Sequence, residues 1–138
     1  MSGFDTKELD AFSKDLLKIA EKDLPIESKN FLRKNARKLA TITKNTAKRL
    51  GIEDQTGEYY SKFKSGKVYK YHGNLSCRAF NSSNHAHLLE YGHMEKTKNG
   101  EKFIPGFHVF EKASQEYQDV YYENCEEFID KLLEKGLG

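Results

Sequence analysis

Cysteine is scarce in this chain, and long apolar runs are missing. Cys77 and Cys125 are its two cysteines; they lie far apart and neither belongs to a paired motif. A disulfide scaffold or a four-ligand zinc site therefore has no support, and we predict that both pack as small core residues. No apolar run approaches the roughly 18 residues of a membrane-spanning helix, and the N-terminus lacks the basic and apolar regions of a secretory signal. We expect a cytoplasmic protein with no membrane partner.

The 138 residues predict a single domain over positions 1–138. Charged residues make up 32% of the chain and the mean hydropathy is -0.81, so the chain is polar for a globular protein. Nine phenylalanines and eight tyrosines nevertheless spread along it, which argues against disorder.

Helical periodicity dominates positions 4–50. Apolar residues at three- and four-residue spacing predict a helix over residues 6–22, which the Leu24-Pro25 pair ends. A second apolar stripe predicts a helix over residues 26–50 that stops at Gly51, a residue that favours the left-handed helix terminator. This stripe consists of Leu32, Ala36, Leu39, Thr43, Ala47 and Leu50.

Charge is distributed unevenly along the chain. Residues 29–70 contain twelve lysines or arginines against three acids, a net +9, whereas residues 111–135 contain eight acids against three lysines, a net -5. The two segments either neutralise each other inside one subunit or form head-to-tail contacts between subunits.

The basic residues fall on one helix, 29–49, and on a Tyr- and Lys-rich arm, 59–71. Such surfaces are most often solvated faces, but they also suit phosphate binding, base stacking or subunit contact. The candidate contact residues are Arg33, Arg37, Lys38, Lys62, Lys64 and Lys67.

The region 57–104 has the pattern of a small antiparallel sheet. Residues 67–71 alternate as an edge strand, and residues 75–81 and 85–91 predict two strands joined by the polar turn 81–84. Residues 94–100 predict a charged loop, 103–104 a short strand end, and 107–135 a long helix that packs through Phe110, Tyr117, Tyr121 and Phe128. The predicted class is α+β, with the sheet packed on two N-terminal helices and one long C-terminal helix.

Catalytic signals are weak. His85 and His87 would share one strand face and could chelate a metal with Glu90, but no spaced cysteine or carboxylate completes the set. Glu90 has no catalytic counterpart, so we interpret it as a structural anchor that accepts hydrogen bonds. We therefore predict no catalytic residues, no metal and no cofactor.

Two sequence segments resemble one protein family. The first is Ala86, Leu88, Leu89, Glu90, Tyr91 and Gly92; the second is Pro105, Phe107, Phe110 and Ala113. They are similar to the shared pattern of the small neck and tail-completion proteins of long non-contractile-tailed bacteriophages. The chain departs from that pattern where Gly106 separates Pro105 from Phe107 and where Lys112 replaces a second proline before Ala113.

The resemblance implies a structural virion protein that forms a ring, a hexamer, which completes the tail and joins it to the DNA-filled head. It implies neighbouring connector and tail proteins as partners, DNA in the lumen, and a location in the virion neck after assembly in the host cytoplasm. Two alternatives remain open. One is a nucleic-acid-binding module that uses helix 29–49 and arm 59–71. The other is a small metal-dependent hydrolase built on His85, His87 and Glu90.

Overall fold

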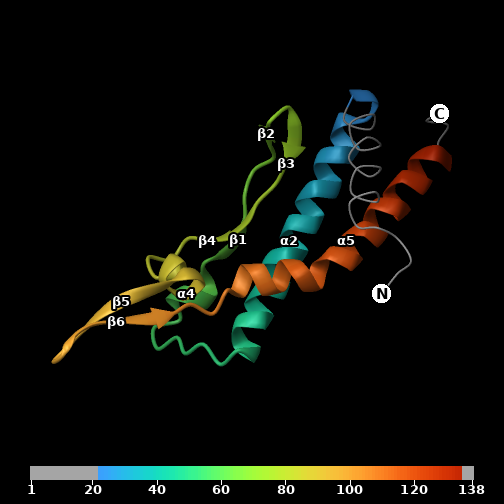
Figure 1. The fold of residues 1–138 in the computed structure, drawn as a ribbon. Helices are drawn as coiled ribbons and strands as arrows, with labels where there is room; N and C mark the ends of the chain where they lie inside the picture. The colour runs from blue at the N-terminus through green and yellow to red at the C-terminus, as the bar shows by residue number, and fades with distance from the viewer. Residues whose placement is uncertain (1–21, 135–138) are drawn as a thin grey trace.

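The structure is a computed structural model, and it describes residues 22–134. Two long helices, α2 (Pro25–Arg49) and α5 (Val109–Glu134), pack against each other and form the body of the molecule (Figure 1). Between them along the chain come short helices and strands: α3 (Glu58–Ser61), β1 (Phe63–Ser65), β2 (Tyr69–Tyr71), β3 (Asn74–Ser76), β4 (Ala79–Asn81), α4 (Ala86–Tyr91), β5 (Gly92–Thr97) and β6 (Gly100–Pro105). The predicted α+β class is confirmed, but the strands form three separate antiparallel pairs instead of one sheet.

Helix α2 matches the prediction closely. Proline suits its first position because that position needs no hydrogen-bonded N–H, and Gly51 adopts a φ of +79° directly after the helix. Ala36, Thr43 and Ala47 of the predicted stripe are buried. The helix predicted over residues 6–22 lies outside the described residues, apart from Lys22.

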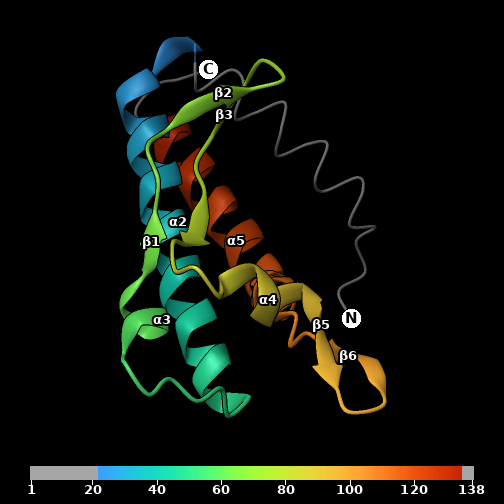
Figure 2. The same ribbon diagram turned by 90° about the vertical axis from the view of Figure 1, so that its left-hand side faces the viewer.

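Residues 62–82, which include residues 62–71 of the predicted arm, form an extended segment that we call the arm from here on. It runs beside α2 towards the N-terminal end of that helix (Figures 1 and 2). Strand β1 pairs with β4 near the body, and β2 pairs with β3 at the tip. The strand predicted over residues 67–71 is therefore present in part, as β2. The strand predicted over residues 75–81 is interrupted at Cys77 and Arg78, where the pairing changes from one sheet to the other.

The strand predicted over residues 85–91 is wrong, because residues 86–91 form helix α4. Ala86 and Leu89, three positions apart, pack on a core of Ala47, Ile52, Tyr59 and Val109. Short apolar runs fit a strand or a helix equally well, and here tertiary packing selects the helix. The predicted hairpin turn 81–84 instead leads from β4 into α4, with the Ser83 N–H donating to Asn81 Oδ1 at 2.9 Å.

The charged loop predicted over residues 94–100 is also wrong. It belongs to a hairpin in which β5 pairs with β6, from Gly92 opposite Pro105 to Thr97 opposite Gly100. The predicted strand end at residues 103–104 extends into all of β6. This hairpin projects away from the two long helices (Figures 1 and 2).

Helix α5 contacts α2 through aromatic side chains. Tyr117 is buried, and Phe128 stacks on Phe31 with ring centroids 4.5 Å apart. Phe110 lies 5.9 Å from Phe63 of β1, measured between ring centroids. The predicted packing face of this helix is therefore present, although Phe110, Tyr121 and Phe128 are only half-buried.

Candidate assembly site

Glu90 connects helix α4 to the start of helix α5. One carboxylate oxygen, Oε1, accepts the Phe110 N–H at 2.9 Å, and the other, Oε2, lies 3.3 Å from the Glu111 N–H, which donates to it. These N–H groups lie in the first turn of α5, where they have no partner within the helix. A carboxylate there also interacts favourably with the helix dipole. Glu90 therefore caps α5 from a distant part of the chain, and its predicted role as a hydrogen-bond-accepting anchor is confirmed, although it ends a helix instead of a strand.

Two glycines bring the backbone segments around Glu90 into direct contact. Gly92 has a φ of +92° and a ψ of 177°, a conformation essentially restricted to glycine. A Cβ atom on Gly92 would lie 2.5 Å from the Ile104 carbonyl oxygen, and one on Gly106 would lie 2.4 Å from the Glu90 carbonyl oxygen. Side chains are therefore excluded at both positions by neighbouring backbone.

Backbone hydrogen bonds complete this contact. The Phe107 N–H donates to the Leu89 carbonyl at 2.7 Å, and the His108 N–H donates to the Glu90 carbonyl at 3.1 Å. We call residues 89–92 and 105–111 together the joint. It fixes α4, the β5–β6 hairpin and α5 relative to one another.

All ten residues of the predicted family motif lie in or beside the joint. Ala113 is fully buried and Ala86 and Leu89 pack on the core, whereas Tyr91 is 71% exposed. The structure explains why position 106 is a glycine: its backbone packs against the Glu90 carbonyl group and leaves no room for a side chain. The motif is therefore a compact structural unit, but it holds a helix–hairpin–helix connection and not the strand that its pattern predicts.

The hairpin carries exposed apolar side chains at its base. Met94 lies opposite Phe103 in the register, and each is 56% exposed. Tyr91 and Phe107 in the joint are also exposed. Exposed apolar residues can mark protein–protein contact sites, so we refer to the exposed apolar residues of the joint and the hairpin, Tyr91, Met94, Phe103 and Phe107, as the apolar patch.

The predicted basic contact residues on α2 lie on two sides of that helix. Arg37 lines a hollow of about 310 Å³ together with Lys44 of the same helix and Lys64 of β1. Lys38 lies on the side that faces α5, in a second hollow whose lining includes Glu127. Lys62 is half-buried and Lys67 is exposed in the arm.

One row of cations follows the arm side of α2. The helix contributes Arg33, Arg37, Lys44 and Lys48, and β1 contributes Lys64; we call these five residues the basic stripe. In an ideal helix of 3.6 residues per turn, its four α2 members fall within an arc of roughly 60°. Lys48 also places its Nζ 5.7 Å from the centre of the Tyr60 ring. The basic stripe is thus a continuous surface built from two elements.

Intramolecular neutralisation of the two charged helices is limited. Arg49 at the end of α2 forms an ion pair with Glu116 of α5. At this pair, the basic and acidic segments do neutralise each other inside one subunit.

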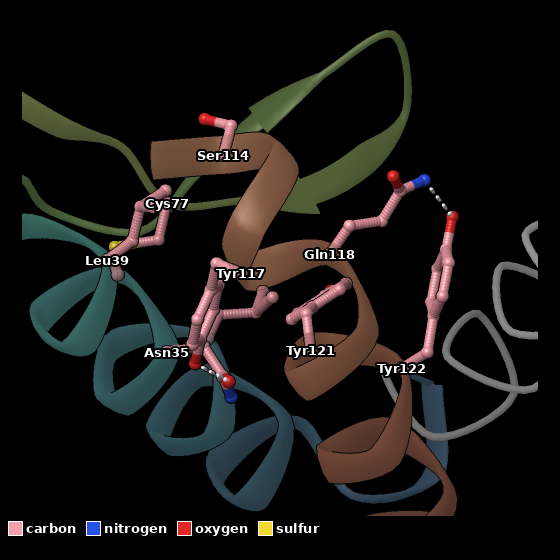
Figure 3. A pocket seen from close by; sticks show the side chains of 10 residues that line it. Asn35, Leu39, Cys77, Ser114, Tyr117, Gln118, Tyr121 and Tyr122 are labelled. Carbon is pink, nitrogen blue, oxygen red and sulfur yellow. Dashed lines mark hydrogen bonds between the residues drawn. The ribbon is translucent and has the colours of Figure 1, made fainter. Parts of the chain in front are cut away.

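A buried polar network joins the two long helices (Figure 3). The Tyr117 hydroxyl donates to Asn35 Oδ1 at 2.5 Å, as Figure 3 shows. The Asn124 side-chain amide donates to the same oxygen at 3.0 Å. Burial raises the pKa of the Tyr117 hydroxyl, while the hydrogen bond from Asn124 lowers it to a smaller extent. Sequence analysis missed this network; its one signal was an asparagine, Asn35, beside the apolar stripe of α2.

Asn35 and Tyr117 also border a pocket of about 310 Å³ (Figure 3). Tyrosines 117, 121 and 122 line it from α5, and Cys77 lines it from the arm. Burial raises the pKa of the Cys77 thiol, partly offset by Arg33, by a hydrogen bond from the Arg78 backbone and by Arg37. Cys125 is fully buried, as predicted, whereas Cys77 is half-buried.

The histidines expected on one strand face are separated by the helix. Positions 85 and 87 are two residues apart at the start of α4, which turns their side chains roughly 200° from each other. Both side chains are exposed. Within residues 22–134, no three histidine, cysteine or carboxylate side chains lie close enough together to hold a metal ion.

Comparisons with protein-family models, curated proteins and solved structures give no match to this chain. In the part of the chain from residue 22 to residue 134, no helix has both the length and the apolar character required to cross a membrane.

Proposed function

We propose that this chain is a structural protein of the bacteriophage neck, where a ring of its copies completes the tail and joins it to the DNA-filled head. The observation that carries the proposal is the joint. The residues that resemble the family pattern lie together there. Glu90 accepts two backbone hydrogen bonds through its carboxylate, and Gly92 packs against backbone that leaves no room for a side chain.

The apolar patch supports an assembly role. The joint fixes the hairpin, which carries Met94 and Phe103, relative to α5 through backbone contacts, and the hairpin projects from the body (Figure 1). A preorganised surface of this kind loses little conformational entropy on binding, which suits a contact with a neighbouring neck or tail protein. In the proposed ring, Tyr91, Met94 and Phe103 bind the adjacent connector or tail-tube subunit.

Labelling of virus particles tests this proposal. An epitope-tagged copy is expressed in the cell that encodes the chain, and released tailed particles are examined by immunogold electron microscopy. We expect label at the head–tail junction. Particles that contain none of the tagged protein by mass spectrometry would contradict the proposal.

A paired variant addresses the apolar patch. Met94→Ser with Phe103→Ser should leave the chain folded, because both side chains are exposed, but should abolish incorporation into particles. The control is Lys96→Ser with Glu101→Ser, a pair opposite each other nearer the hairpin tip, which should be incorporated normally.

A further inference from the structure

The basic stripe is a solvent-exposed, positively charged surface that could bind an anionic partner. Arg33, Arg37, Lys48 and Lys64 are exposed, and Lys44 is half-buried at the hollow between α2 and β1. Among the described residues, no ion pair involves any member of the stripe. Within residues 22–134, therefore, no carboxylate neutralises its positive charge.

Helix α5 carries a matching row of carboxylates. Asp119, Glu123, Glu126 and Asp130 follow one another at helical spacing and are all exposed; we call them the acidic stripe. Residues 116–134 contain seven acids and one lysine. At 1.5 Å per residue, α2 and α5 are both roughly 40 Å long, so the two stripes can extend along each other.

The two stripes of one molecule face away from each other. On α2, Asn35 contacts Tyr117 of α5, and Arg37 lies two residues further along, roughly 200° round the helix. On α5, Phe128 stacks on Phe31 of α2, and Asp130 lies two residues further along, again roughly 200° round. Neither stripe can neutralise the other within one subunit.

We infer that the basic stripe of one copy binds the acidic stripe of the next copy. This contact uses two different surfaces of the same chain, so it is heterologous and repeats around a closed ring or along a filament. The inference deepens the proposed function and rests on it, because it names the surfaces that join neighbouring ring subunits.

The charge distribution favours a second copy over nucleic acid as the partner. The net charge of the whole chain is only +2 and its pI is about 8.4, below the values above 9 that are typical of nucleic-acid-binding domains. The acidic stripe supplies, on another copy of the same chain, a complement of the same length and opposite charge.

Charge reversal on each stripe provides the test. The first variant carries Arg33→Glu, Arg37→Glu and Lys44→Glu; the second carries Asp119→Lys, Glu123→Lys and Glu126→Lys. The matched control reverses three lysines outside both stripes, Lys70→Glu, Lys98→Glu and Lys102→Glu. Sedimentation velocity is measured for each protein at low and high salt, and circular dichroism verifies folding.

The expected pattern is specific to this contact. The wild type and the control associate at low salt and dissociate as salt screens the charges. Each stripe variant alone associates at least about tenfold more weakly, since like charges then meet across the contact. An equimolar mixture of the two variants recovers association, because the reversed stripes are again complementary.

Other outcomes overturn the inference. If the first variant associates as well as the wild type, the copies join through another surface, and the neck function can still stand. If the wild type stays monomeric at low salt but binds duplex DNA through Arg33, Arg37 and Lys44, the stripe is a nucleic-acid contact. In either case the particle-labelling experiment decides the proposed function separately.

Discussion

The joint and the α2–α5 interface are stabilised in different ways. In the joint, backbone meets backbone: Gly92 and Gly106 have no room for a Cβ atom, and the Glu90 carboxylate replaces a local helix cap. Between the helices, half-buried aromatic rings surround a small polar network centred on Asn35. The joint therefore tolerates almost no substitution at its closest contacts, whereas the helix interface should lose stability in graded steps.

The largest effect is expected at Gly92. Gly92→Ala forces a side chain into a positive-φ conformation and against the Ile104 carbonyl, and each of these costs about 1 to 3 kcal/mol. We expect a loss of about 3 kcal/mol or more in urea denaturation, or failure to fold. Gly73→Ala is the control, since Gly73 also has a positive φ but open space around it. Equal losses for the two variants would mean that the joint is not closely packed.

The helix interface should respond less strongly. Asn35→Ala leaves the buried Tyr117 hydroxyl and the Asn124 amide without their shared acceptor, at a cost of about 2 to 3 kcal/mol. Asn45→Ala on the exposed side of the same helix should change stability by less than about 0.5 kcal/mol. If both variants unfold at the wild-type urea concentration, the network does not contribute to stability.

Removal of the remote cap should have a moderate effect. Glu90→Ala leaves two N–H groups of α5 without their carboxylate, and loss of a helix cap costs about 0.5 to 2 kcal/mol. Glu90→Gln should retain part of that stability, because its amide oxygen still accepts one hydrogen bond. Thermal unfolding of both variants, with exposed Glu95→Ala as the control, measures this order; a Glu90→Ala variant as stable as the control would contradict it.

The smallest effect concerns alkaline pH. Burial raises the pKa of Tyr117 in the folded chain above its ordinary value of 10.0, so above that pH the unfolded chain releases a proton that the folded chain retains. This contribution to stability is therefore present below pH 10 and is lost as the pH rises further. Tyr117→Phe should make the decline of stability above pH 10 shallower than in the wild type. A decline as steep as that of the wild type would show that Tyr117 does not cause it.

The same two regions differ in how far sequence reasoning could describe them. Both long helices follow from the periodic spacing of their apolar residues, and Pro25 and Gly51 mark the two ends of α2. The bounds of both helices were predicted within a few residues. Glu90 was predicted to accept hydrogen bonds as a structural anchor, and it does so, although from a helix instead of a strand. The joint around Glu90 was not predicted, because residues 86–91 are too short for their periodicity to distinguish a strand from a helix.

The chain by itself determined the α+β class, the extent of α2 and α5, and the segregation of basic and acidic residues between them, because helix periodicity and charge are local properties of sequence. Only the tertiary structure decided that residues 86–91 are helical, that Glu90 caps a helix twenty residues away, and that the arm brings Lys64 beside Arg37 and Lys44. Each of these depends on contacts between segments distant in the chain, whose free energy outweighs local preference.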